Sequence, residues 1–443
     1  MKMLLFLKSV VQQVFLLFKI LFIFAAIFCI PKFFLLYAPT DKVVLEPKVF
    51  VNFKLGLENI PKKLMLHLKF GKNGNPLNIG LITNQTGIDQ AGKRNIDLLI
   101  AQGYNITTLY GPEHGISGKA LADKKVDNTL DEKTSLPVVS LYLGNSRFRK
   151  FVEKDLKDID AFIFDMQDSG MRHYTYISVL FKMMEIAAEF DKEFIVLDRP
   201  NPLGYVMEGP LVSSEYLSFI SIAPVPLRHA MTIGEIAKYF KKFRIKKPIR
   251  LTVAPMQDYN RTQGLNNKLP MFLSPNIKTL DSCFGYSFLC ILGEGIRPFN
   301  VGVGTDKAFQ NLVLPNSLEI PLVRWYELRK LLPSKNVKTN ITACEKDGEK
   351  YSGVKIKIEN INEFSAFNTL VDICQFFKSN GMKFTYSPTF NKLVGTDKLR
   401  SFLDGKITRK QMSDCVNTDL EKFYEDTKDL FIYHPFPKII LAK

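Results

Sequence analysis

The sequence predicts an α/β fold of the doubly wound class, followed by a smaller α+β domain. Short runs of continuous apolar residues recur in the first half of the chain, which is typical of strands buried on both faces of a parallel sheet. Helical patterns alternate with these runs, as expected when helices connect parallel strands. Polar residues gather directly after the apolar runs, where ligands bind in open parallel sheets.

The elements of the sheet domain follow one another between residues 75 and 255. Five strands are predicted, at Leu77–Thr83, Ile106–Tyr110, Pro137–Tyr142, Ile159–Asp165 and Glu193–Asp198. Four helices are predicted, at Ile96–Ala101, Phe148–Leu156, Tyr176–Phe190 and Thr232–Phe240. Thr232 is a suitable N-cap for the last helix, because Glu235 lies three residues further on and completes a capping box.

The alternation weakens after residue 255. The segment Pro270–Phe309 is rich in Gly, Pro and Asn, and Val354–Lys378 with the residues around it has the mixed pattern of an α+β unit. We therefore expect residues 256–443 to form the smaller domain. Residues 38–74 are expected to be a linker or a lead-in to the sheet.

The N-terminal segment, residues 1–37, is typical of a targeting sequence. It contains four lysines and no acidic residue, and Ile20–Ile30 is an uninterrupted apolar run of eleven. This length suits the core of a signal peptide, but no clean small-x-small cleavage site follows, which favours a signal anchor that is not cleaved over a cleaved signal peptide. Because three of the four lysines precede the core, we expect export in both cases, to the periplasm or to the outer face of the inner membrane.

Charge and cysteine content exclude some functions. The formal net charge is +16, but the lysines are scattered and no nucleic-acid-binding module is recognisable, so we expect no nucleic-acid partner. The excess is consistent with attraction to an anionic cell wall or membrane. None of the six cysteines forms a CxxC pair, which argues against zinc ribbons and thioredoxin-like sites. The sequence is compatible with buried free thiols and with one disulfide bond.

Four of the five predicted strands end in polar loops. These loops are Asn84–Gly87, Gly111–Gly115, Asp165–Tyr174 and Asp198–Gly204. Because the carboxyl ends of parallel strands meet at one edge of a sheet, their carboxylates, imidazoles and guanidiniums should lie close together. The sequence therefore predicts a binding site at this edge.

Glu113 and His114 are the strongest candidates in these loops. They lie between Gly111-Pro112 and Gly115, on a tight loop where a buried structural role is difficult to satisfy. The other positions keep structural alternatives: Asp165 as a loop cap, Asp198-Arg199-Pro200 as a local ion pair, and His173 as a core histidine. The glycine-rich GxGT segment at Gly302–Thr305 lacks the context of a dinucleotide site.

The motifs, taken together, resemble those of the NamZ-type exo-β-N-acetylmuramidases, first described as the DUF1343 family of exported bacterial proteins. The matching stretches come in the family's order over roughly residues 75–310: Gly80–Gly87, Pro112–Gly115, Asp165–Asp168, Arg172 with Tyr174–Ile177, Leu197–Gly204, Glu208–Pro210, Arg228–Glu235 and Ser274–Asn276. This chain departs from the family at two positions that concern the site. Val303 stands where many members have an arginine, with Arg297 nearby, and His173 replaces a residue that is commonly apolar or aromatic.

The resemblance implies a Rossmann-like N-terminal domain, a smaller C-terminal domain and an active site in the cleft between them. It also implies that N-acetylmuramic acid is released from the non-reducing end of peptidoglycan fragments, in cell-wall turnover or recycling, without a cofactor. Glu113 corresponds to the glutamate proposed as catalytic in the family.

Glycoside cleavage requires a proton donor and a second group that faces the anomeric carbon. We expect Glu113 to be the acid, with His114 orienting it or binding substrate. The candidates for the second group are Asp168, Asp165 and Glu294, in that order. Arginine pairs well with carboxylates, so the lactyl carboxylate of N-acetylmuramic acid is expected to meet one of Arg172, Arg199 and Arg297. The further predicted substrate-binding residues are Asn84, Tyr174, Asp198, Asn201 and Asn276.

Two other functions fit the same residues. Asp165, Asp168, His114 and His173 together would suit a metal-dependent hydrolase. A wall-binding protein without activity, tethered by its N-terminus, is the second alternative.

Overall fold

The computed structural model describes residues 52–121, 124–145, 147–263, 272–333 and 335–443. The chain divides into residues 1–50 and residues 51–443, and all described residues lie in the second unit. The predicted targeting segment, residues 1–37, lies outside the described residues. None of the helices in the described ranges has the length and hydropathy that crossing a membrane requires.

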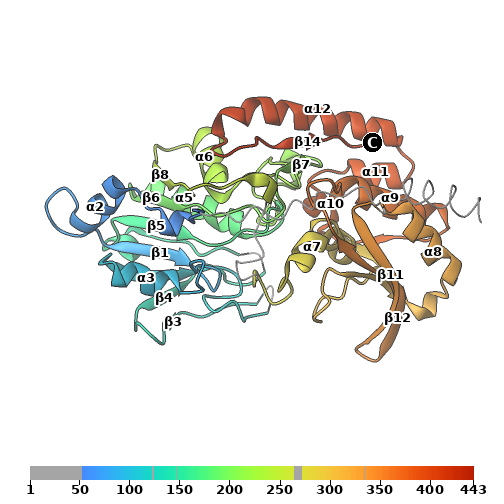
Figure 1. Cartoon of the computed structure of the whole chain (residues 1–443), viewed down its shortest axis with the longest axis horizontal. Helices are drawn as coiled ribbons and strands as arrows, with labels where there is room; N and C mark the ends of the chain where they lie inside the picture. The colour runs from blue at the N-terminus through green and yellow to red at the C-terminus, as the bar shows by residue number, and fades with distance from the viewer. Residues whose placement is uncertain (1–51, 122–123, 146, 264–271, 334) are drawn as a thin grey trace, which may run out of the picture. The chain divides into compact units, whose positions relative to one another are not determined.

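A seven-stranded sheet forms the first part of the fold (Figure 1). Its order is β3 (Thr129–Leu130), β4 (Pro137–Ser140), β2 (Ile106–Gly111), β1 (Ile79–Thr83), β5 (Ala161–Asp165), β6 (Glu193–Leu197) and β8 (Arg250–Ala254). All neighbours pair in parallel except β3, which is antiparallel to β4. Counted along the chain, the parallel strands have the 3-2-1-4-5-6 order of a Rossmann fold. The predicted fold class is confirmed.

The connecting helices are α3 (Asn95–Ala101), α4 (Glu153–Leu156), α5 (Tyr176–Glu189) and α6 (Ile233–Phe243). Crossovers on the two sides of β1 run in opposite directions, which places their helices on opposite faces of the sheet. Thr232 caps α6 as predicted, since its side chain accepts from the Glu235 amide. The helix predicted from Phe148 begins only at Glu153, because the Phe148 backbone pairs with Tyr142 instead.

The predicted lead-in packs against the sheet domain where it is described. It contains the turn η1 (Gly56–Glu58) and the helix α2 (Lys62–Phe70). Leu55 and Leu57 are buried, and the Gly56 amide donates to the Asp198 carbonyl at 2.9 Å.

The second part of the fold is built on an antiparallel sheet of the order β10-β12-β11. Its elements are α7 (Leu280–Gly295), β9 (Ile296–Arg297), β10 (Asn311–Pro315), α8 (Leu322–Leu331), β11 (Val337–Lys346), β12 (Glu349–Ile358), α9 (Ala366–Ser379), β13 (Thr385–Tyr386), α10 (Phe390–Val394) and α11 (Lys398–Leu403). Figure 1 shows β11 and β12 as one long hairpin, with ten paired residues in each strand.

The end of the chain returns to the sheet domain. After α12 (Arg409–Thr427), strand β14 (Lys438–Ile440) pairs in parallel with β7 (Val206–Glu208). The Tyr433 hydroxyl donates to Asp198 Oδ2 at 2.7 Å. The C-terminal residues therefore pack against the sheet domain, although they belong to the range 256–443 that was expected to form the smaller domain.

A buried ion pair of the sheet domain also contacts the second part of the fold. Arg228 donates to Glu208 Oε1 at 2.9 Å, and both side chains are almost fully buried. Glu208 additionally accepts from the amides of Ala366 and Phe367, at the N-terminus of α9, where a negative charge is favourable.

Candidate active site

A cavity of about 360 Å³ lies beyond the carboxyl ends of β2, β4 and β5. The position agrees with the predicted edge of the sheet, and α7 with residues in and near α10 supplies a further part of the lining. It is lined by Glu113, His114, Tyr142, His173, Tyr174, Thr175, Tyr176, Ile220, Ser274, Asn276, Ile277, Tyr286, Cys290, Glu294, Val303, Phe309, Thr389 and Leu393.

Glu113 projects from the loop that follows β2 and is half-buried. Its Oε2 accepts a hydrogen bond from the Thr175 hydroxyl at 3.0 Å. Thr175 is the N-cap residue of α5, so the carboxylate lies beside the start of a fourteen-residue helix. Thr175 was not predicted as a site residue, because a threonine before a helix is ordinary in a sequence.

His114 has a backbone φ of 70°, in the left-handed region that non-glycine residues rarely adopt. Its Nδ1 donates to the Ala120 carbonyl at 2.7 Å, since a carbonyl can only accept. This fixes the ring and leaves Nε2 as the nitrogen for other contacts. An unfavourable backbone next to Glu113 is typical of a functional loop.

Glu294 is the second carboxylate of the cavity. It lies in the last turn of α7 and is exposed. Glu113 and Glu294 are thus brought together by the fold from positions that are distant in the sequence.

Asp168, the first choice for the second catalytic group, does not line the cavity. Its side chain is buried, its Oδ2 accepts from the Gly170 amide at 2.7 Å, and His229 Nε2 lies 3.6 Å away. The carboxylate turns back onto its own loop, which removes Asp168 from direct contact with a ligand in this cavity. The structure therefore does not place Asp168 with Glu113 in the lining of the candidate site.

Asp165 and Arg199, which were predicted to bind substrate, pair with each other in the interior. Both are buried, and Arg199 donates to the two Asp165 oxygens at 2.6 and 2.8 Å. Asn95 donates a further hydrogen bond to Asp165 at 2.7 Å. The pair links the ends of β5 and β6, and neither residue lines the cavity.

Arg172 also has a structural role and does not line the cavity as a substrate-binding residue would. Its guanidinium is fully buried and donates to four backbone carbonyls, those of Pro210, Val225, Leu393 and Val394, at 2.6 to 3.2 Å. The Nη1 and Nη2 donors of Arg172, which a substrate carboxylate would require, are therefore already bound to backbone carbonyls.

Asp198 and Asn201 likewise belong to the interior. Asp198 accepts from the Gly234 amide and from the hydroxyls of Thr232 and Tyr433, and burial raises its pKa to about 6. Asn201 donates to the Met231 carbonyl at 3.0 Å. Neither residue lines the cavity, so the structure does not bring these two predicted binding residues to the candidate site.

Three other predicted binding residues lie in or behind the cavity. Tyr174 lines it and donates to the Leu273 carbonyl at 2.8 Å, and Asn276 lines it and accepts from the Gly304 amide. Asn84 lies one layer behind, where it donates to the Tyr176 hydroxyl at 2.6 Å. Arg297 lines a neighbouring cavity instead.

The comparisons with known proteins begin with family models. The N-terminal model of the exo-beta-N-acetylmuramidase NamZ matches residues 79–281, and the C-terminal model matches residues 284–433. The chain belongs to the NamZ family.

Individual relatives agree with this membership. The chain is 33% identical over 374 residues to the peptidoglycan beta-N-acetylmuramidase NamZ of Bacillus subtilis, a match that covers 80% of this chain and 86% of the relative. Two crystal structures of DUF1343 family proteins from Bacteroides fragilis are similar in fold. The first has a TM-score of 0.74 and 30% sequence identity, and the match covers 86% of this chain and 99% of that structure's chain. The second has a TM-score of 0.65 and 25% sequence identity, and the match covers 87% of this chain and 100% of that structure's chain.

His173 lies in the cavity wall. Its ring lies 4.9 Å from that of Tyr286, and neither ring nitrogen has a hydrogen-bond partner among the described residues. Burial, together with the nearby Arg172 charge, lowers the pKa of His173 to about 3. Burial therefore favours the neutral imidazole near neutral pH.

The buried imidazole predicts a pH-dependent stability. Between pH 6.5 and 3 the unfolded chain binds a proton at His173 that the folded chain does not, so stability is lost as the pH falls. His173→Phe should remove this loss. Between pH 7.5 and pH 5, the difference in unfolding free energy between wild type and variant should shift by about 2 kcal/mol in favour of the variant. Urea titrations at both pH values measure it, and an unchanged difference would contradict the buried, neutral assignment.

The residues proposed for a metal-dependent hydrolase are not assembled around one point. Asp165 is held by Arg199 and Asn95, and Asp168 lies outside the cavity that His114 and His173 line. Within the described ranges, no group of three or more His, Cys, Asp or Glu is arranged to hold a metal ion.

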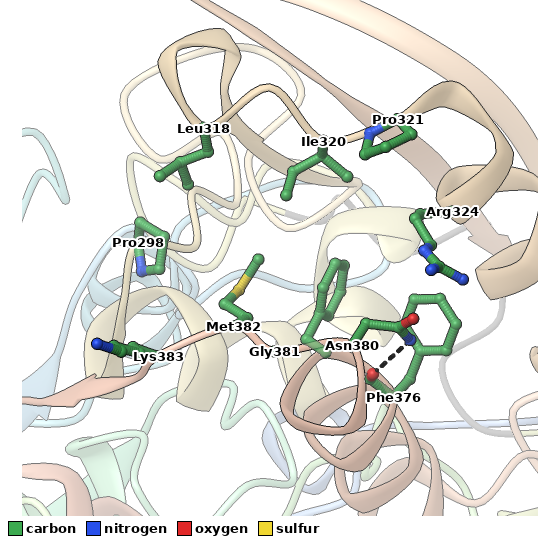
Figure 2. A pocket seen from close by; sticks show the side chains of 11 residues that line it. Pro298, Leu318, Ile320, Pro321, Arg324, Phe376, Asn380, Gly381, Met382 and Lys383 are labelled. Atoms are coloured by element: carbon green, nitrogen blue, oxygen red, sulfur yellow. Dashed lines mark hydrogen bonds between the residues drawn. The ribbon is translucent and has the colours of Figure 1, made fainter.

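A separate cavity of about 340 Å³ lies in the second part of the fold (Figure 2). Its wall is mainly apolar, and Figure 2 shows Pro298, Leu318, Ile320 and Met382 around it. Its lining carries no carboxylate and no imidazole, so it lacks the acid that glycoside cleavage needs. This cavity is therefore a weaker candidate for glycoside cleavage than the one that Glu113 lines.

Proposed function

We propose that this protein removes N-acetylmuramic acid from the non-reducing end of peptidoglycan fragments by glycoside hydrolysis. Membership of the NamZ family gives the reaction class. The observation that carries the proposal is the position of Glu113, which lines a cavity at the carboxyl edge of the sheet with Thr175 bound to its Oε2.

Glu113 acts as the acid in this proposal. A half-buried carboxyl group on a rigid loop can deliver a proton to the leaving oxygen of the glycosidic bond. The Thr175 hydroxyl holds one carboxyl oxygen at 3.0 Å, which restricts its rotation. His114 Nε2 is available to contact the substrate or to orient Glu113, since Nδ1 is committed to Ala120.

Glu294 is the second carboxylate. Asp165 is engaged with Arg199, and Asp168 is outside the cavity, so Glu294 is the remaining member of the predicted set that lines it. It comes from α7, whereas Glu113 comes from the loop after β2, so two separate elements supply the two carboxylates that glycoside cleavage requires. The cavity of about 360 Å³ falls within the range of small-molecule sites.

The comparison of two aryl glycosides tests this function. The purified protein should hydrolyse an aryl N-acetyl-β-muramide and release N-acetylmuramic acid, while the matching N-acetyl-β-glucosaminide should be a much poorer substrate. Tight binding of muramides without turnover would instead indicate a wall-binding protein, and equal hydrolysis of both sugars would remove the muramic-acid assignment.

We further propose export by residues 1–37, with a role in cell-wall turnover and recycling outside the cytoplasm. The support is the sequence itself, in which basic residues precede the apolar run Ile20–Ile30. The polymer that the proposed activity acts on is also found outside the cytoplasm.

A reporter that is active only after export tests this prediction. Fused after Pro47, it should be active, and deletion of residues 1–37 should abolish its activity. Fractionation then distinguishes a cleaved signal peptide from an anchor, because only an anchored reporter stays with the membrane. Activity of the converse reporter, which works only in the cytoplasm, would contradict export.

A further inference from the structure

A second cavity adjoins the candidate active site. Its volume is about 400 Å³, and Glu294 and Val303 line both cavities. The β11–β12 hairpin forms one side of it through Lys346, Glu349 and Tyr351. A ligand that fills the first cavity can therefore extend past Glu294 into the second.

The two cavities differ in charge. The lining of the first holds Glu113 and Glu294 and, among the described residues, neither lysine nor arginine. The lining of the second holds two cations, Arg297 and Lys346, beside two carboxylates, Glu294 and Glu349. A carboxylate on the ligand would therefore find a counter-charge in the second cavity and none on the lining of the first.

Arg297 is held in place for such a contact. Its backbone pairs with Thr385 between β9 and β13, and its Nη1 donates to the Gly293 carbonyl. Within the described ranges, neither Arg297 nor Lys346 has a carboxylate oxygen within the 4.0 Å of an ion pair. Glu349, the hairpin carboxylate that lines this cavity, accepts a hydrogen bond from the Tyr351 hydroxyl at 2.7 Å.

We propose that this adjoining cavity is a carboxylate subsite, in which Arg297 and Lys346 bind a carboxylate of the muramyl substrate while the bond to be cleaved lies at Glu113. The proposal rests on the proposed function. A guanidinium pairs with a carboxylate through two parallel hydrogen bonds, and the lysine adds a second charge. The carboxylate has two sources: the lactyl group of the sugar that is released, or a carboxylate carried on the leaving-group side.

Binding of N-acetylmuramic acid tests the first source without turnover. Arg297→Ala or Lys346→Ala should weaken binding by about tenfold each, the effect of a lost charged hydrogen bond. The lactyl methyl ester of the same sugar should bind wild type and variants equally. Lys350→Ala is the matched control, because Lys350 is an exposed cation on the same hairpin that does not line the cavity. Titration calorimetry measures all of these affinities.

A longer glycan tests the second source. A muramyl tetrasaccharide, bound to a Glu113→Gln background so that it is not cleaved, carries a carboxylate on each muramic acid. If Arg297→Ala and Lys346→Ala leave the monosaccharide unchanged but weaken the tetrasaccharide by about tenfold, the carboxylate comes from the leaving-group side.

Two results would overturn the subsite: no effect of either variant on any ligand, or an equal loss for the acid and its neutral ester. Failure of the proposed function is a different result, namely that the wild type cleaves no muramide. The affinity of the monosaccharide still reports on Arg297 and Lys346 in that case.

Discussion

Glu113→Gln should lower the rate of muramide hydrolysis by about 10²- to 10⁴-fold, the contribution typical of a general acid. The substitution keeps the size of the side chain and its contact with Thr175 but removes the proton supply. Initial rates on an aryl N-acetyl-β-muramide measure the effect. Glu345→Gln is the matched control, because Glu345 is exposed on β11 and does not line the cavity.

The variant should fold and bind as the wild type does. Thermal unfolding and the affinity for N-acetylmuramic acid should stay close to wild type, which separates lost chemistry from lost structure. A Glu113→Gln protein with full activity would remove Glu113 from the mechanism, and the reaction would then have to be assigned to Glu294 and His114 alone.

Arg172→Met should destabilise the protein by about 3 kcal/mol or more. The arginine is fully buried and satisfies four carbonyls that reach it from both parts of the fold, at Pro210, Val225, Leu393 and Val394. Methionine fills similar space but leaves these acceptors without donors, and each unsatisfied buried group costs about 1–3 kcal/mol. Urea unfolding measures the loss.

The same variant distinguishes a structural residue from a substrate-binding residue. The protein that remains folded should retain its preference for muramide over glucosaminide. Arg297→Ala serves as the comparison, because an exposed side chain should change stability by less than about 0.5 kcal/mol. An Arg172→Met protein that is as stable as wild type but has lost muramide selectivity would contradict the structural role.

Apolar continuity in the sequence was sufficient to predict most of the sheet. β1 and β5 are buried at every position, so their sequences are unbroken apolar runs apart from small or terminal polar residues. β8 was missed, because as an edge strand of sequence RLTVA it is only partly buried and shows no such run. The contact of β14 with β7 could not be predicted either, since nothing local in Lys438–Ile440 names a partner that is more than two hundred residues away.

The candidate site was predictable where a local constraint marks it. The glycines around Glu113 and His114 identified a tight loop, and the structure places both side chains in the cavity. Charged residues at other strand ends were misleading, because Asp165 and Arg199 look the same in a sequence whether they face a ligand or each other. Tyr286 reaches the cavity from the middle of α7, where a tyrosine carries no signal of function.

The central claim, that the protein is an exo-acting muramidase, is tested most directly by its product from a defined glycan. A peptidoglycan tetrasaccharide with N-acetylmuramic acid at its non-reducing end is incubated with the purified protein. The products are separated by chromatography and identified by mass spectrometry. The account predicts free N-acetylmuramic acid and a trisaccharide as the first products, and none from a glycan that begins with N-acetylglucosamine. Disaccharides as first products, or equal release from both glycans, would contradict it.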